Sequence, residues 1–93
     1  MEASLIRTDG CGELIVPENE KDFSLEEIQR YVGGYIEIVY LNGDMIMVVN
    51  EEGKIMGMDI NPVATFIAHD NNSIPAYDYI VGNVVVCKRS MLK

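Results

Sequence analysis

Residues 35–50 read YIEIVYLNGDMIMVVN and contain the strongest local folding signal in the chain. Two runs rich in β-branched and aromatic residues flank Asn42-Gly43, a dipeptide typical of a two-residue hairpin turn. Such a turn sets Leu41 opposite Asp44 and gathers apolar side chains on one face of the hairpin. These side chains are Ile36, Ile38, Tyr40, Met45, Met47 and Val49. We therefore expect a β-hairpin whose apolar face packs against a helix.

The opposite face of this hairpin is mixed, yet it carries more aliphatic side chains than a solvated face normally shows. They are Val39, Leu41, Ile46 and Val48. Either another element or a partner must cover this second face. We expect the cover to be the chain's own second helix or a second copy of the chain.

A short helix is predicted immediately before the hairpin, from about Ser24 to Val32. Ser24 is a favourable N-cap, and Glu27 three residues later completes a capping box. Phe23 and Ile28 occupy the positions of a hydrophobic staple, and Gly33-Gly34 supplies the helix stop. The stripe expected to face the core consists of Leu25, Ile28 and Val32.

The segment after the hairpin predicts a turn and a second helix. Residues 51–54, Glu-Glu-Gly-Lys, suggest a turn with Gly53 in the left-handed conformation, followed by a third strand at 55–58. Asn61 as N-cap and Pro62 at the first helical position predict a helix through about His69. The inward face of this helix is expected to comprise Val63, Phe66 and Ile67.

Short strands are expected at both ends of the chain, at residues 4–7, 13–16 and 80–88. Together with the hairpin they predict an α+β domain with a mostly antiparallel sheet of about five to six strands and two short helices. The length of 93 residues allows one domain, with a core at about 4–88 and a basic C-terminal tail at 89–93.

The charge of the chain limits its partners. Fifteen acidic and seven basic residues give a formal net charge of −8, so we expect no direct binding to nucleic acid. The chain has no apolar run of the roughly 18–20 residues that a membrane helix needs, and its start lacks the basic region of a secretory signal. We expect a cytoplasmic protein that does not bind membranes.

Few residues suggest chemistry. Cys11 and Cys87 match no metal or redox spacing, so we expect reduced thiols, no metal and no cofactor. His69 could act as a general base beside Asp70 or Asp59 but is better explained as a helix-end residue. Glu51-Glu52 with Asp59 could bind a divalent cation, although adjacent carboxylates at a turn are usually solvated. We find no catalytic constellation and expect a protein that is not an enzyme.

Four parts of the sequence carry a resemblance to a known family: residues 32–37 (VGGYIE), 48–54 (VVNEEGK), 78–86 (DYIVGNVVV) and the helix-opening Asn61. Together they resemble an uncharacterised family, a domain of unknown function (number 3846) found in bacteria, phages and conjugative elements. The resemblance covers roughly residues 13–88. It implies a small α+β domain linked to a mobile element or its host, and it implies no reaction.

The binding residues suggested by the sequence are Asn50, Glu51 and Glu52, together with Asn61. The turn needs only Gly53, so stability does not explain the two adjacent carboxylates. One hypothesis is a non-enzymatic accessory protein whose acidic surface engages a basic protein partner, with a homodimer as another possible assembly. The alternative is a small-molecule or nucleotide-binding domain with a site near Asn50–Glu52 and Asn61.

Overall fold

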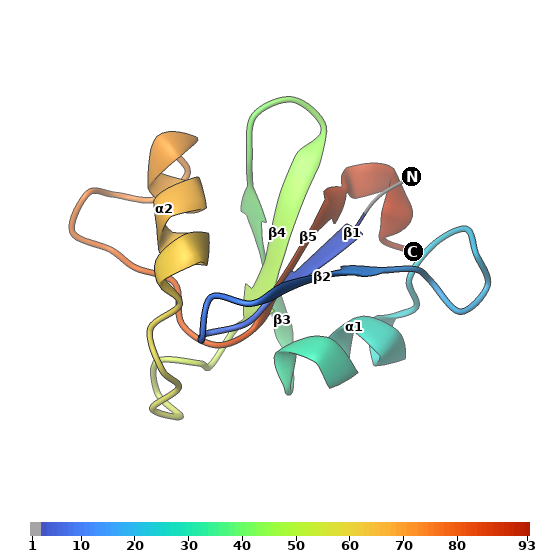
Figure 1. Cartoon of the computed structure of the whole chain (residues 1–93), viewed down its shortest axis with the longest axis horizontal. Helices are drawn as coiled ribbons and strands as arrows, with labels where there is room; N and C mark the ends of the chain where they lie inside the picture. Colours follow the sequence, from blue (N-terminus) through green and yellow to red (C-terminus); the bar gives the residue numbers. More distant parts are fainter. Residues whose placement is uncertain (1–2) are drawn as a thin grey trace.

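A computed structural model describes residues 3–93 and shows one five-stranded antiparallel sheet with a helix on each face (Figure 1). The strand order is β2-β1-β5-β4-β3, so β2 and β3 form the two edges. The strands are β1 (Ala3–Ile6), β2 (Gly12–Ile15), β3 (Ile36–Tyr40), β4 (Met45–Asn50) and β5 (Val84–Lys88). The helices are α1 (Leu25–Val32), α2 (Pro62–Asp70) and the short 3-10 helix η1 (Arg89–Met91). The predicted α+β class is confirmed.

Alternating residues of the central strands contribute to two separate hydrophobic cores. Ile46 and Val48 of β4 face α1, while Met47 and Val49 face α2. Successive side chains of a strand point to opposite faces, so one apolar run can serve both cores. The α1 core also contains Phe23, Ile28, Val32, Val85, Cys87 and Met91, and the α2 core contains Ala64, Ala68, Ile80 and Val84.

The predicted capping box at the start of α1 is confirmed. The Glu27 N–H donates to Ser24 Oγ at 3.1 Å, and the Glu27 carboxylate accepts from the N–H groups of Ser24 and Glu18 at 2.9 and 2.8 Å. These backbone hydrogen bonds, Ser24 first, lower the pKa of Glu27. Gly33 ends the helix with a φ of 84°, as expected of a C-terminal glycine. Leu25, however, is 52% exposed and does not belong to the inward stripe.

The hairpin exists, but its predicted register is wrong by one residue. Leu41 pairs with Met45 rather than Asp44, and its N–H donates to the Met45 carbonyl at 3.0 Å. A two-residue type I′ turn needs positive φ at both central residues, and within residues 3–93 Gly43 has it (70°) whereas Asn42 does not. The connection is therefore three residues long. Consequently the expected single apolar face does not exist.

The second helix begins at the predicted Asn61-Pro62 but presents a different face to the sheet. Ala64 and Ala68 are buried, whereas Phe66 is 69% exposed and Val63 is also on the outside. Ile67 is the correctly predicted member, since it packs against the α2 core. This helix covers Val39 and Leu41 of the expected second face of the hairpin, whereas Ile46 and Val48, expected beside them, face α1.

The prediction of a third strand at 55–58 is wrong, because residues 51–57 form consecutive turns. Gly53 is not the left-handed residue either; Gly57 is, with a φ of 72°. Gly53 is required for a different reason. A Cβ there would lie 2.7 Å from Val81 Cγ2, so the turn packs too closely for a side chain.

The chain ends are integrated into the fold. The two N-terminal strands lie within a residue of their expected positions, and the last strand is shorter than expected, beginning at Val84. The segment 89–93 is not a tail outside the core. Met91 is buried in the α1 core, and the Phe23 N–H donates to the Met91 carbonyl at 2.7 Å. In the sequence, the basic residues of this segment suggest an exposed tail and give no sign that Met91 is part of the core.

Candidate functional site

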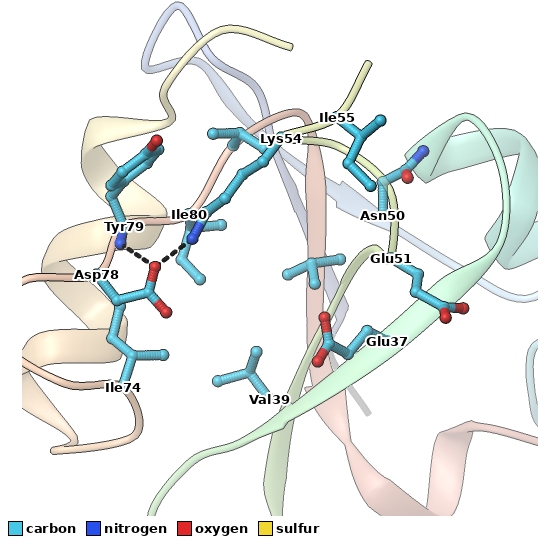
Figure 2. A pocket seen from close by; sticks show the side chains of 12 residues that line it. Glu37, Val39, Asn50, Glu51, Lys54, Ile55, Ile74, Asp78, Tyr79 and Ile80 are labelled. Carbon is cyan, nitrogen blue, oxygen red and sulfur yellow. Dashed lines mark hydrogen bonds and ion pairs between the residues drawn. The ribbon is translucent and has the colours of Figure 1, made fainter. Parts of the chain in front are cut away.

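A cavity of about 170 Å³ lies on the α2 side of the sheet, between the β3–β4 hairpin and the segment that follows α2 (Figure 2). Its aliphatic lining comes from both parts of the chain: Val39, Val49, Ile55, Ile74, Ile80 and Val81. Its polar lining consists of Glu37, Asn50, Glu51, Lys54, Asp78 and Tyr79. The cavity thus combines an apolar interior with a charged rim.

An ion pair between Lys54 and Asp78 closes one side of this rim (Figure 2). The Lys54 ammonium also lies 4.5 Å from the centroid of the Tyr79 ring, in a cation–π contact. The hydrogen bond to Asp78 raises the pKa of Lys54, and the same bond, followed by one from the Tyr79 N–H, lowers the pKa of Asp78. Both groups are therefore charged at neutral pH, and the pair fastens the 51–57 turns to the segment after α2.

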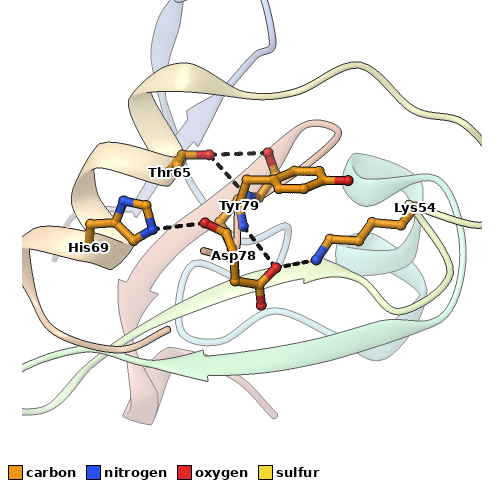
Figure 3. Close-up of polar contacts among 6 residues, drawn as sticks. Lys54, Thr65, His69, Asp78 and Tyr79 are labelled. Atoms are coloured by element: carbon orange, nitrogen blue, oxygen red, sulfur yellow. Dashed lines mark hydrogen bonds and ion pairs between the residues drawn. The ribbon is translucent and has the colours of Figure 1, made fainter. Parts of the chain in front are cut away.

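Two side chains of α2 hold that segment in place (Figure 3). Thr65 Oγ1 accepts from the Ile80 N–H at 2.9 Å, and His69 Nε2 lies 2.8 Å from the Asp78 carbonyl oxygen. A carbonyl can only accept, so Nε2 of His69 carries the proton and donates it to this hydrogen bond. His69 consequently supports the cavity wall and is not paired with Asp70 or Asp59 as a general base would be.

The two asparagines suggested by the sequence have structural tasks. Asn61 is fully buried, donates through Nδ2 to the carbonyls of Ile6 and Gly82 at 3.0 and 2.9 Å, and accepts from the Ala64 N–H at 3.0 Å. It does not line the cavity. Asn50 does, but its Nδ2 donates to the Val32 carbonyl and its Oδ1 accepts from the Glu52 N–H. The structure therefore does not bring Asn50 and Asn61 together in one site.

The two glutamates suggested by the sequence differ in position. Both are exposed; Glu51 lines the cavity, whereas Glu52 does not. Glu37 of β3 is a third exposed carboxylate, and in Figure 2 it points into the space between the hairpin and Asp78, while Glu51 lies along the outer rim. Across residues 3–93, neither Glu37 nor Glu51 forms an ion pair. Glu37 also helps to raise the pKa of Lys54, and both exposed carboxylates remain accessible to a further cation.

Other chemistry has little support in the part of the chain that the structure describes. No group of three or more His, Cys, Asp or Glu side chains there could hold a metal ion. Burial raises the pKa of the Cys87 thiol to about 11, and Cys11 is exposed and separate from it. None of the helices formed by residues 3–93 is long and apolar enough to cross a membrane.

The sequence reasoning missed Glu37, Lys54, Asp78 and Tyr79 as members of one site. One signal was available, because Lys54 is the single basic residue among seven acidic ones in residues 31–79. An isolated cation in an acidic region is expected to find a carboxylate partner. Which carboxylate it meets depends on how the segment after α2 folds back, and the sequence does not reveal that.

The fold is that of a small α+β domain with a helix on each face of an antiparallel sheet. On the α2 face it has a cavity with an acidic rim, about large enough for one side chain. The chain belongs to the family described as Domain of unknown function (DUF3846), whose family model matches residues 3–91. No curated protein and no solved structure matches the chain.

Proposed function

We propose that this protein is a non-enzymatic accessory protein that binds a basic protein partner, and that its cavity receives a lysine or arginine side chain of that partner. The observation that carries the proposal is the combination of an aliphatic interior with the unpaired carboxylates of Glu37 and Glu51. Lysine and arginine have the matching structure, an apolar stem that can be buried and a charged head that stays near water.

The size of the cavity supports a single side chain as the occupant. Pockets for drug-sized ligands usually enclose about 300–1,000 Å³, whereas this cavity encloses about 170 Å³. A nucleotide would also bring phosphate groups to a rim with three carboxylates and one ammonium. Size and charge therefore both favour the basic partner over the small-molecule or nucleotide alternative.

The charge of the whole chain supports the same kind of partner. A net charge of −8 accelerates encounter with a basic protein and slows encounter with nucleic acid or with a second copy of the chain. A homodimer formed through this rim would bring like charges together. We infer that the cavity serves a different, basic protein.

The test is the binding of a blocked, arginine- and lysine-rich peptide to the protein and to three single variants, Glu37→Gln, Glu51→Gln and Glu52→Gln. Each variant removes one exposed carboxylate, so all three change the net charge equally. Glu52 lies outside the cavity and is the matched control. We expect Glu37→Gln to weaken binding about tenfold, corresponding to about 1.4 kcal/mol, with a smaller loss for Glu51→Gln and almost none for Glu52→Gln.

Equal losses in the three variants would show that only the overall charge matters and would remove the cavity from the proposal. Binding that survives all three substitutions would do the same. Folding should be unaffected in each variant, because surface substitutions of this kind usually change the free energy of unfolding by less than about 0.5 kcal/mol.

We also propose that the protein acts in connection with mobile genetic elements, a suggestion that rests on the family resemblance of residues 32–37, 48–54 and 78–86. The genes that neighbour its own test this suggestion. Restriction or conjugation genes beside it in several genomes would support the link, and consistent placement among metabolic genes would contradict it.

A further inference from the structure

One edge of the sheet is open beside the cavity. The Leu41 N–H donates to the Met45 carbonyl, and the Glu51 N–H donates to the Tyr35 carbonyl. In an antiparallel pair, residues alternate between those that exchange hydrogen bonds with the partner strand and those that point away from it. The odd-numbered residues of β3 therefore form hydrogen bonds to β4. The N–H and C=O groups of the even-numbered residues Ile36 and Ile38 point outward from the edge of the sheet.

These outward groups have no partner among residues 3–93. The other end of the edge is closed, because Ser73 Oγ donates to the Tyr40 carbonyl and the Asn42 N–H donates to Asn71 Oδ1. The open part of β3 is thus confined to the end next to the cavity. It displays a short row of backbone donors and acceptors of the kind to which an extended peptide can add as a further strand.

The side chains along β3 define what such a strand must carry. Glu37 and Val39 face the cavity side, whereas Ile36 and Ile38 face the α1 core and remain half-buried. A strand added beside β3 places alternate side chains on these same two faces. Basic residues would meet the carboxylate of Glu37, and the apolar residues between them would cover Ile36 and Ile38.

We propose that the basic partner binds by adding a strand to the edge of β3, and that the bound segment alternates basic and apolar residues. This inference rests on the proposed function, since one of the basic side chains is the one that enters the cavity. It adds the binding mode and the sequence pattern of the partner.

Two other arrangements fit the structure less well. The opposite edge, β2, also has outward-facing backbone groups at Leu14, but it contributes no residue to the cavity. A second copy of the chain would add its own β3 and would bring a second net charge of −8 against the first. A basic strand at β3 satisfies both the backbone and the carboxylates.

The experiment uses a blocked heptapeptide in which basic and apolar residues alternate, in three forms. One form has normal amides, one carries N-methyl groups on its odd-numbered amides, and one carries them on its even-numbered amides. Only one edge of an added strand bonds to β3, so one methylated form should bind like the parent peptide. The other should bind about tenfold more weakly or worse, because its methyl groups remove hydrogen bonds and obstruct the edge.

Amide hydrogen exchange of the protein gives a second, independent measurement. Addition of the parent peptide should slow exchange at Ile36 and Ile38 and leave Leu14 on the opposite edge unchanged. Equal affinities of the two methylated forms, or unchanged exchange at Ile36 and Ile38, would overturn strand addition.

The outcomes also separate this inference from the proposed function. If both methylated forms bind equally while Glu37→Gln still weakens binding more than Glu52→Gln, the cavity stands and strand addition is wrong. If the parent peptide does not bind at millimolar concentration, both proposals are wrong.

Discussion

The two faces of the sheet are covered in different ways. On one face, α1 lies close to β3, β4 and β5 and fills its core with large side chains such as Phe23 and Ile28. On the other, α2 contributes mainly Ala64 and Ala68, and the irregular segment after it completes the cover. The cavity lies on this second face.

The difference shows how a small domain can combine a tightly packed core with a surface cavity. Large interdigitating side chains fill the core beneath α1, so the α1 face supplies stability. Small helix residues and a segment held by a few polar contacts leave space on the α2 face. Binding residues are often carried by such irregular segments, positioned by a rigid scaffold.

The sharpest contrast between the two faces should be seen with Ile28→Ala and Phe66→Ala. Ile28 of α1 is completely buried against the sheet, and its truncation should lower the free energy of unfolding by about 2–5 kcal/mol. Phe66 is 69% exposed on α2, so the same truncation should cost less than about 0.5 kcal/mol. Urea unfolding of both variants measures the difference, and similar losses would contradict the placement of Phe66.

Asn61→Ala should cost less than Ile28→Ala but far more than any change at the rim of the cavity. It removes a helix cap and leaves two buried carbonyls, those of Ile6 and Gly82, without their donor. We expect a loss of about 2–3 kcal/mol in thermal or urea unfolding. A loss below about 0.5 kcal/mol would contradict this structural role of Asn61.

Lys54→Met tests the ion pair that closes the cavity, with an effect of about 0.2–1 kcal/mol because both side chains are partly exposed. The pKa of Asp78 is lowered from 3.8, so its contribution is present above that pH and is lost as the pH falls further. The pKa of Lys54 is raised from 10.5, so its contribution is present below that pH and is lost as the pH rises further.

The stability difference between the protein and Lys54→Met should therefore be constant near neutral pH and shrink at both extremes. Unfolding measured across the pH range checks this shape. A difference that instead disappeared between pH values of about 6 and 8 would show that the pair does not contribute as the structure indicates.

Much of the fold was predictable because its signals are local. The capping box of Ser24 and Glu27 and the Asn61-Pro62 helix start each depend on a few neighbouring residues, and both are confirmed. The hairpin register was not predictable in the same way. Residues 45–49 are apolar on both faces, so a shift of one residue still leaves an apolar face and the pattern cannot distinguish the registers.

The candidate site was only partly predictable. Glu51 was proposed from the sequence because the turn does not need it, and the structure places it at the cavity. Asn50 follows from the same reasoning and Asn61 from the small-molecule alternative at the helix start, but their backbone partners, such as Val32 and Gly82, are distant in sequence. Glu37 and Asp78 line the same cavity only because β3 and the segment after α2 converge, which no local pattern reveals.

The most direct test of the binding role is an NMR titration with two small probes, N-acetylarginine methylamide and its citrulline counterpart. Citrulline keeps the shape of the arginine side chain but has no charge, so the pair isolates the effect of the cation. We expect saturable shifts for the arginine probe at the amides of Glu37, Glu51 and Tyr79, weakened by salt, and much smaller shifts for citrulline. Equal shifts with both probes, or arginine shifts spread over the whole acidic surface, would contradict the binding role.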